Sequence, residues 1–262
     1  MFVRDEEQNI GRTIDSILDQ TVKFDNVFIV DDCSVDDTVK IIEDKGLEPL
    51  KLMTRHPSFI GTRNLSIIAN ESIRAIYSQP CDFFAFSGGD IVLDVDYVEV
   101  ILEKFHADPD LVAASGWIRG ELFNENTPRG CCRFYRFSFW DEHIKAFPYC
   151  YAWESYPMYK ALSLGYRIGA FRDAGMVTLR PTRIYKPAFG QCMRELGYYV
   201  PLAIGRCFLA MFDGEVATGL SMLYNYFSCN VEPYDPVLAA YIKSYQRKAF
   251  LRKSFAALRR LL

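Results

Sequence analysis

One stretch of the sequence constrains the fold more than any other. An apolar run, Val27–Val30, is followed by two acids, Asp31 and Asp32, then by a short turn and a second acidic pair, Asp36 and Asp37. The run predicts a buried strand, and the second pair suits a helix N-terminus, where acids complement the helix dipole. Such a strand end lies at the carboxyl edge of an α/β sheet, where ligands bind. The pattern also fits a simple strand-to-helix turn with acidic caps.

The same alternation of strand and helix runs through the first 118 residues. Further strands are predicted at residues 50–53, 82–86, 91–93 and 111–118, and helices at 10–18, 65–76 and 96–106. This alternation predicts an α/β fold with a mostly parallel central sheet flanked by helices. Met1–Val3 reads as the end of a strand, so we expect residues before Met1 in the full protein. No G-x-G-x-x-G follows a strand, which argues against a dinucleotide-dependent oxidoreductase.

Composition narrows the class of protein. The chain has 262 residues, half of them hydrophobic, and a net charge of -3, which argues against general nucleic-acid binding. Its eight cysteines form no C-x-x-C pair, so we expect reduced thiols and a cytoplasmic protein. The sequence contains neither a secretory leader nor an apolar run of about 20 residues.

The middle of the chain is aromatic and looks irregular. Residues 120–153 contain ten aromatic side chains, among them Phe134, Trp140 and Trp153, which form either a satellite core or a wall for a bulky ligand. A helix is then predicted from Glu154 to Leu164. Gly165 would end it, and a strand is predicted over residues 166–171.

The C-terminal part of the chain has a different composition. We expect a first domain over residues 1–180 and a helical region over 181–262. From Pro236 to Leu262 there are seven basic residues and no acid, with apolar residues at the helical spacing of 251, 255, 258 and 262. This pattern predicts a basic amphipathic helix on an anionic membrane surface, at the cytosolic face, or else a solvated helix packed on the domain.

Four stretches together resemble the family 2 glycosyltransferases, which are inverting enzymes of the GT-A fold. Three of them are Val3–Glu7, Val30–Thr38 and Gly61–Asn64, and the fourth joins Trp153–Glu154 to Gly165–Ile168. The second is close to the family's Val-Asp-Asp-Gly-Ser-Thr-Asp-x-Thr. The resemblance implies a GT-A fold over the first domain and binding of a nucleotide-sugar.

The resemblance also implies roles for single residues in donor binding. Asp32 would accept a hydrogen bond from the base, and Val3 and Glu6 would line the base and ribose. Arg63 would approach the base or the diphosphate, or else would be an ordinary helix-start arginine in an ion pair. Asp31 is expected to hold the turn.

The metal-binding part of the family pattern is altered. The family places an Asp-x-Asp after the strand at 82–86, but here Ser87 and Gly89 stand in place of the two acids and only Asp90 remains. The resemblance implies a cofactor, Mg²⁺ or Mn²⁺, that Asp90 would bind together with phosphate oxygens. Otherwise Asp90 only caps a glycine turn.

A general base completes the implied site. Glu154 matches the second acid of the family's Glu-Asp pair, whereas Trp153 stands in place of the first. Glu154 would take the proton of the attacking acceptor. If it does not, it is an acid that serves a helix dipole.

The resemblance implies an inverting transfer from a UDP- or GDP-sugar to a lipid-linked or glycan acceptor. Arg183 or Lys186 would hold an acceptor phosphate. The alternative is a catalytically impaired sugar-nucleotide-binding partner protein of the same fold, which the missing acids keep open.

Overall fold

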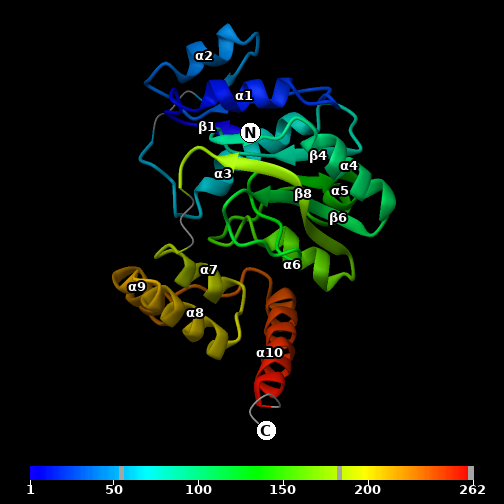
Figure 1. Cartoon of the computed structure of the whole chain (residues 1–262). Helices are drawn as coiled ribbons and strands as arrows, with labels where there is room; N and C mark the ends of the chain where they lie inside the picture. The colour runs from blue at the N-terminus through cyan, green and yellow to red at the C-terminus, as the bar shows by residue number, and fades with distance from the viewer. Residues whose placement is uncertain (53–55, 182–184, 259–262) are drawn as a thin grey trace. The chain divides into compact units, whose positions relative to one another are not determined.

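The computed structural model describes residues 1–52, 56–181 and 185–258, with side chains up to residue 251 (Figure 1). The chain forms two compact units. The first consists of Met1–Ser58, Ile67–Phe147 and Leu164–Thr182, and the second of Phe59–Ser66, Pro148–Ser163 and Arg183–Leu262. The sequence placed a domain boundary at residue 180; the units divide near it, and two earlier segments belong to the second unit.

A small parallel sheet begins the first unit. It consists of β1 (Phe2–Val3), β2 (Val30–Asp31) and β3 (Leu50–Lys51), in that order. Helices α1 (Ile10–Leu18) and α2 (Thr38–Asp44) connect the strands, as the alternation predicted. Because Val3 pairs with Asp31, both strands end at the same edge.

A five-stranded sheet forms the rest of the first unit. Its strand order is β4 (Phe83–Phe86), β7 (Arg133–Arg136), β6 (Leu111–Ile118), β8 (Arg167–Thr178) and β5 (Ile91–Leu93). Only β6 and β8 pair in parallel, and β4–β7, β6–β7 and β5–β8 are antiparallel. The expectation of a mostly parallel sheet is therefore met in the first sheet and not in the second. There β7 runs antiparallel to both of its neighbours, and the chain reverses over the four residues between β4 and β5, so that β5 runs antiparallel to β8.

The segment expected to be irregular contains regular structure. Strand β7 and helix α5 (Phe137–His143) lie within residues 120–153, so that expectation was wrong. Phe134 and Trp140 are buried in the first unit, and the Trp140 ring packs edge-on against Phe84 and Phe147. These rings form core, one of the two alternatives that the sequence left open.

Two further helices position the core of the first unit. Helix α3 spans Leu65–Ile76, and α4 spans Tyr97–Ala107. The buried Tyr97 hydroxyl accepts a hydrogen bond from the Gly116 N–H (2.8 Å) and donates one to the Cys132 carbonyl (2.9 Å). Tyr97 thereby joins α4 to β6, because both of its partners are buried backbone groups that need hydrogen bonds.

The second unit is helical. It contains α6 (Tyr156–Ser163), α7 (Phe189–Glu195), α8 (Val200–Phe212), α9 (Val216–Ser228) and α10 (Pro236–Leu258). Gly219 lets α9 approach α8 closely, since a Cβ there would lie 2.6 Å from the Cys207 carbonyl oxygen. Helix α6 begins two residues after Glu154, and Gly165 has the positive φ (+88°) predicted at the helix end. In the part of the chain described here, no helix is both long and apolar enough to span a membrane.

We expect Gly116→Ala to destabilise the first unit. A Cβ at Gly116 would lie 2.0 Å from the Ala174 carbonyl oxygen and 2.4 Å from the Tyr97 ring, so backbone must move. The expected loss is at least about 2 kcal/mol, measured by urea unfolding. Gly205→Ala in α8 is the control, because nothing lies within 4 Å of its Cβ position and Ala favours a helix. An unchanged unfolding midpoint for Gly116→Ala would contradict this packing.

Candidate active site

The edge where β1 and β2 end carries the first group of predicted site residues. The Asp32 N–H donates to the Val3 carbonyl (2.9 Å), which fixes Asp32 beside the end of β1. The Asp31 carboxylate accepts the Ser34 N–H at 3.2 and 3.3 Å, so Asp31 holds the turn, as the sequence indicated. Cys33 in this turn has a positive φ of 56°. The turn therefore directs Asp32 toward the sheet edge, whereas the Asp31 carboxylate binds the backbone of the turn.

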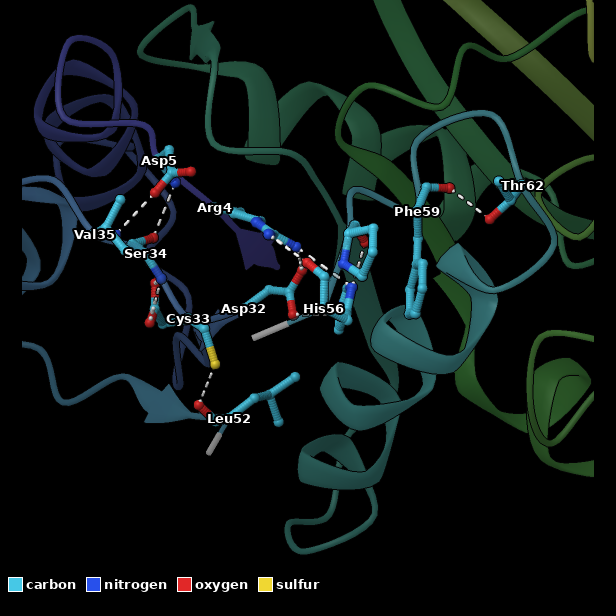
Figure 2. Close-up of polar contacts among 12 residues, drawn as sticks. Arg4, Asp5, Asp32, Cys33, Ser34, Val35, Leu52, His56, Phe59 and Thr62 are labelled. Carbon is cyan, nitrogen blue, oxygen red and sulfur yellow. Dashed lines mark hydrogen bonds and ion pairs between the residues drawn. The ribbon is translucent and has the colours of Figure 1, made fainter. Parts of the chain in front are cut away.

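Asp32 lies in a cluster with two basic residues (Figure 2). Its Oδ2 accepts a hydrogen bond from Arg4 Nη1 at 3.2 Å, and its Oδ1 lies 2.9 Å from His56 Nε2. Arg4 also donates to the His56 carbonyl at 2.6 Å. His56 Nδ1 lies 2.6 Å from the Pro57 carbonyl oxygen and 3.4 Å from Arg4 Nη1.

Glu6 is buried beside this edge, at the start of α1. Its N–H donates to the Thr38 hydroxyl (2.7 Å), and its carbonyl accepts the Ile10 N–H (2.9 Å), which fixes the backbone. The carboxylate accepts a hydrogen bond from Asn9 Nδ2 at 3.0 Å and forms a close ion pair with Arg180. Burial raises the pKa of Glu6, while hydrogen bonds and the Arg180 charge oppose the rise. Val3 is almost completely buried, so it lies beneath the site.

The loop between β4 and β5 closes over the same α1 helix. The Thr13 hydroxyl donates to the Gly89 carbonyl (2.9 Å) and accepts the Ile91 N–H (3.1 Å). A Cβ at Gly89 would lie 2.8 Å from Val3 Cγ1, so position 89 has no room for a side chain. Asp90 Oδ2 pairs with Arg180 Nε at 3.0 Å. Arg180 therefore bridges the Glu6 and Asp90 carboxylates.

The residues at this loop do not fit a divalent metal site held by the protein. One of the two positions aligned with the family acids, Gly89, is closed to side chains, and the Ser87 hydroxyl donates to the Gly88 carbonyl. Asp90 is the remaining carboxylate, and a guanidinium occupies one of its oxygens. Among the residues that the structure describes, no three His, Cys, Asp or Glu side chains are grouped as metal ligands. A divalent ion would find a single protein carboxylate here, already paired with Arg180, and would need phosphate oxygens and water as its other ligands.

Arg63 belongs to the second unit and lies just before α3. Its guanidinium lies over the Tyr149 ring, 5.0 Å from the centroid, and the Tyr149 hydroxyl donates to Asn64 Oδ1 at 2.6 Å. Arg63 is exposed, so its charge is available to a ligand. Its charge also acts on the buried Glu195 and lowers the pKa of that carboxyl, although burial raises it more.

Glu154 also belongs to the second unit, in the turn before α6. It is half-buried, next to the buried Trp153. Glu195 on α7 accepts the Ala152 N–H at 3.1 Å and so holds the backbone two residues before Glu154. The turn that presents Glu154 is thus anchored by a second buried acid.

Four residues of these clusters were not among the predicted site residues. They are Arg4, His56, Arg180 and Glu195. Arg4 lies within the resembling stretch Val3–Glu7, so its neighbours gave a signal. Arg180 comes to Asp90 through the pairing of β5 with β8, and Glu195 through helix packing. Those contacts join residues far apart in the sequence and leave no local pattern.

Comparison with protein families gives one clear result. The sequence model of the family described as Glycosyl transferase family 2 matches residues 1–162. A comparison with curated proteins gives no match.

Solved structures share the fold at low sequence identity. TarS 1–349 of S. aureus in complex with UDP has a TM-score of 0.52 and 16% identity over 74% of this chain, and this chain spans 62% of that one. The mannosyltransferase PcManGT from Pyrobaculum calidifontis, in complex with GDP-Man and Mn²⁺, has a TM-score of 0.57 and 17% identity over 98% of this chain and 78% of that one.

A third similar structure comes from Mycobacterium tuberculosis. Its glucosyl-3-phosphoglycerate synthase, in complex with Mn²⁺ and UDP-Glc, has a TM-score of 0.53 and 14% identity over 75% of this chain and 74% of that one. These likenesses establish a GT-A fold and no more.

We expect Asp32→Ala to lower the free energy of unfolding, because Arg4 and His56 lose their shared acceptor in a part-buried cluster. The expected loss is about 1–3 kcal/mol by urea unfolding. Asp25→Ala, at an exposed acid, should change stability by less than about 0.5 kcal/mol. Equal stabilities of the two variants would show that the cluster does not support the fold.

Proposed function

Since the chain belongs to glycosyl transferase family 2, we propose that it transfers a sugar from a UDP- or GDP-sugar to an acceptor, with inversion at the anomeric carbon. One observation carries this proposal: a backbone hydrogen bond joins Asp32 to Val3 where two parallel strands end, and the side chains of Val3 and Glu6 both lie beside Gly89. Ligands of α/β folds bind at such edges.

In this proposal Asp32 receives the nucleotide base. An ionised carboxylate offers about four lone-pair sites, and Arg4 and His56 engage one oxygen each. Asp32 can therefore accept an N–H from a uracil or guanine edge without losing its partners. Arg4 and His56 would hold the carboxylate in place for the base. Glu6 would line the base and ribose, and Val3, expected from the sequence to line them as well, is buried and would support them from beneath.

Glu154 is the proposed general base. An inverting transfer needs one group that takes the acceptor proton as the acceptor oxygen attacks C1. Glu154 lies in a turn that Glu195 anchors through the Ala152 N–H. If the acceptor is a phosphate, it needs less help from a base, and Lys186, which is exposed, would bind it. Arg183, the other residue expected to bind such a phosphate, lies outside the described residues.

Two observations bear on the divalent cofactor in opposite directions. Two of the similar solved structures hold Mn²⁺ together with a nucleotide-sugar, which supports Mg²⁺ or Mn²⁺ at Asp90. The pairing of Asp90 with Arg180 and the closed position at Gly89 weigh against it.

We propose that the acceptor is lipid-linked rather than a soluble glycan, and that the protein meets it at the cytosolic membrane face. Helix α10 buries Leu238, Ala239 and Ile242, while Lys243 and Arg247 are exposed. The apolar positions predicted at 255, 258 and 262 lie outside the described side chains. Large apolar side chains are also exposed on α8 and α9, namely Phe208, Leu209, Phe212, Leu220, Tyr224 and Phe227. Exposed apolar and basic residues in one unit suit an anionic lipid surface.

The alternative function is a partner protein that binds sugar nucleotides and transfers nothing. The observation that favours it is the loss of both acids of the Asp-x-Asp pattern, at Ser87 and Gly89. It differs from the first proposal in one measurable property, because donor binding would persist while no sugar moves.

We expect UDP- or GDP-sugars to raise the melting temperature of the wild type, since a ligand of the native state stabilises it by mass action. Glu154→Gln should keep that rise and lose about a hundredfold or more in transfer rate, measured with a radiolabelled donor and a lipid-linked glycan whose hydroxyl is the attacking group. Glu103→Gln, an exposed acid on α4, is the control. A thermal rise with no transfer by the wild type would favour the partner protein, and undiminished transfer by Glu154→Gln would remove Glu154 as the base.

We also expect the protein to co-sediment with vesicles that contain phosphatidylserine. Phe212→Glu should weaken this binding because it places a charge on an apolar surface, and Lys243→Gln should weaken it about fivefold. Leu122→Glu is the control, since Leu122 is 98% exposed in the first unit. Equal sedimentation of all variants, or none by the wild type, would contradict the membrane contact.

A further inference from the structure

We propose that Arg180 supplies the positive charge that stabilises the leaving nucleoside diphosphate, in the place where the family pattern uses a divalent ion. This inference rests on the proposed transfer reaction. In that reaction the acceptor oxygen forms a bond to C1 and gives its proton to Glu154. The bond from C1 to the diphosphate oxygen breaks, and its electron pair stays on that oxygen.

The position of Arg180 follows from the antiparallel pairing of β5 with β8. Ile91 pairs with Thr178, and the Leu179 N–H donates to the Asp90 carbonyl at 2.8 Å. The next residue after Leu179 therefore emerges beside the Asp90 side chain. Arg180 reaches both Asp90 and Glu6 from there, so its guanidinium lies between the loop at 87–90 and the start of α1.

The Arg180 guanidinium has the exposure and the hydrogen-bond donors that binding a phosphate requires. Its side chain is 54% exposed, so a ligand can approach it although two carboxylates hold it. A guanidinium carries five N–H donors in a planar fork, which matches two oxygens of a phosphate. Nε and one terminal nitrogen face Asp90 and Glu6. Arg180 can therefore bind a diphosphate and keep contact with one of its acids.

Packing at the loop explains why position 89 does not carry the second acid of the family pattern. A carboxylate at position 89 would need a Cβ where Val3 Cγ1 lies only 2.8 Å away, and Val3 is 2% exposed. Buried Val3 cannot move without disturbing β1. The loop is also fixed by both hydrogen bonds of Thr13. The position of the second family acid is thus closed by the core itself.

The net charge of the site also supports the replacement of a metal ion by Arg180. Two carboxylates and a divalent cation have a net charge of zero, and so have Asp90 and Arg180 together. The incoming diphosphate therefore meets the same net charge in either arrangement, with Glu6 present in both. The growing negative charge on the leaving oxygen needs a preorganised donor, and a guanidinium held by two acids is one.

The test is the affinity of the full chain for UDP and GDP, measured by isothermal titration calorimetry with EDTA or with Mn²⁺. We expect the wild type to bind one of them within twofold of the same affinity in both conditions. Arg180→Ala should bind about tenfold to a hundredfold more weakly, because charge-assisted hydrogen bonds are lost, and Mn²⁺ should not restore it. Arg180→Lys should lie between the two, since it keeps the charge without the fork.

Arg119→Ala is the matched control. Arg119 is 55% exposed and pairs with Asp94 in the same unit, as Arg180 pairs with Asp90, and its loss should leave binding unchanged. Binding by the wild type that requires Mn²⁺, or an Arg180→Ala variant that binds normally, would overturn the role of Arg180 alone. Failure of the wild type to bind either nucleotide in any condition would overturn the proposed function and this inference with it.

Discussion

The pairing of β1 with β2 is the interaction on which the candidate site depends. It places Val3 beside Asp31, and the hydrogen bond from Asp32 N–H to the Val3 carbonyl carries that alignment one residue past the strands. A shift by one residue would turn every side chain of a strand to the other face. Arg4 would then no longer reach Asp32, and Glu6 would no longer meet the loop that carries Asp90.

A second register, between β5 and β8, completes the site from the other sheet. It sets Asp90 opposite Leu179 and so brings Arg180 to two acids that lie far from it in the sequence. Thr13 on α1 joins the two parts, since its hydroxyl binds the loop on both sides of Asp90. The turn before α1 carries Glu6, and α1 itself fixes the loop with Thr13, so both groups lie on one continuous segment.

Much of this fold can be predicted from local pattern, and the remainder depends on pairing. The acids after Val30 predicted the strand end, β6 lies at the residues expected, and Gly165 has the left-handed conformation expected at a helix end. Each depends on a few adjacent residues. The direction of β5 and the contact of Arg180 depend on which strands become neighbours, and an alternation of apolar and polar residues is the same in either direction.

The altered metal pattern is understood best as one change with two parts. A glycine at position 89 admits the Val3 side chain beneath the loop, and this removes the room for an acid. A single acid at Asp90 would by itself leave the site short of positive charge for a diphosphate. Arg180 restores that charge from a neighbouring strand end, and it also offsets the buried Glu6. Burial penalises the charged form of Glu6, so the same guanidinium helps to keep that carboxylate ionised.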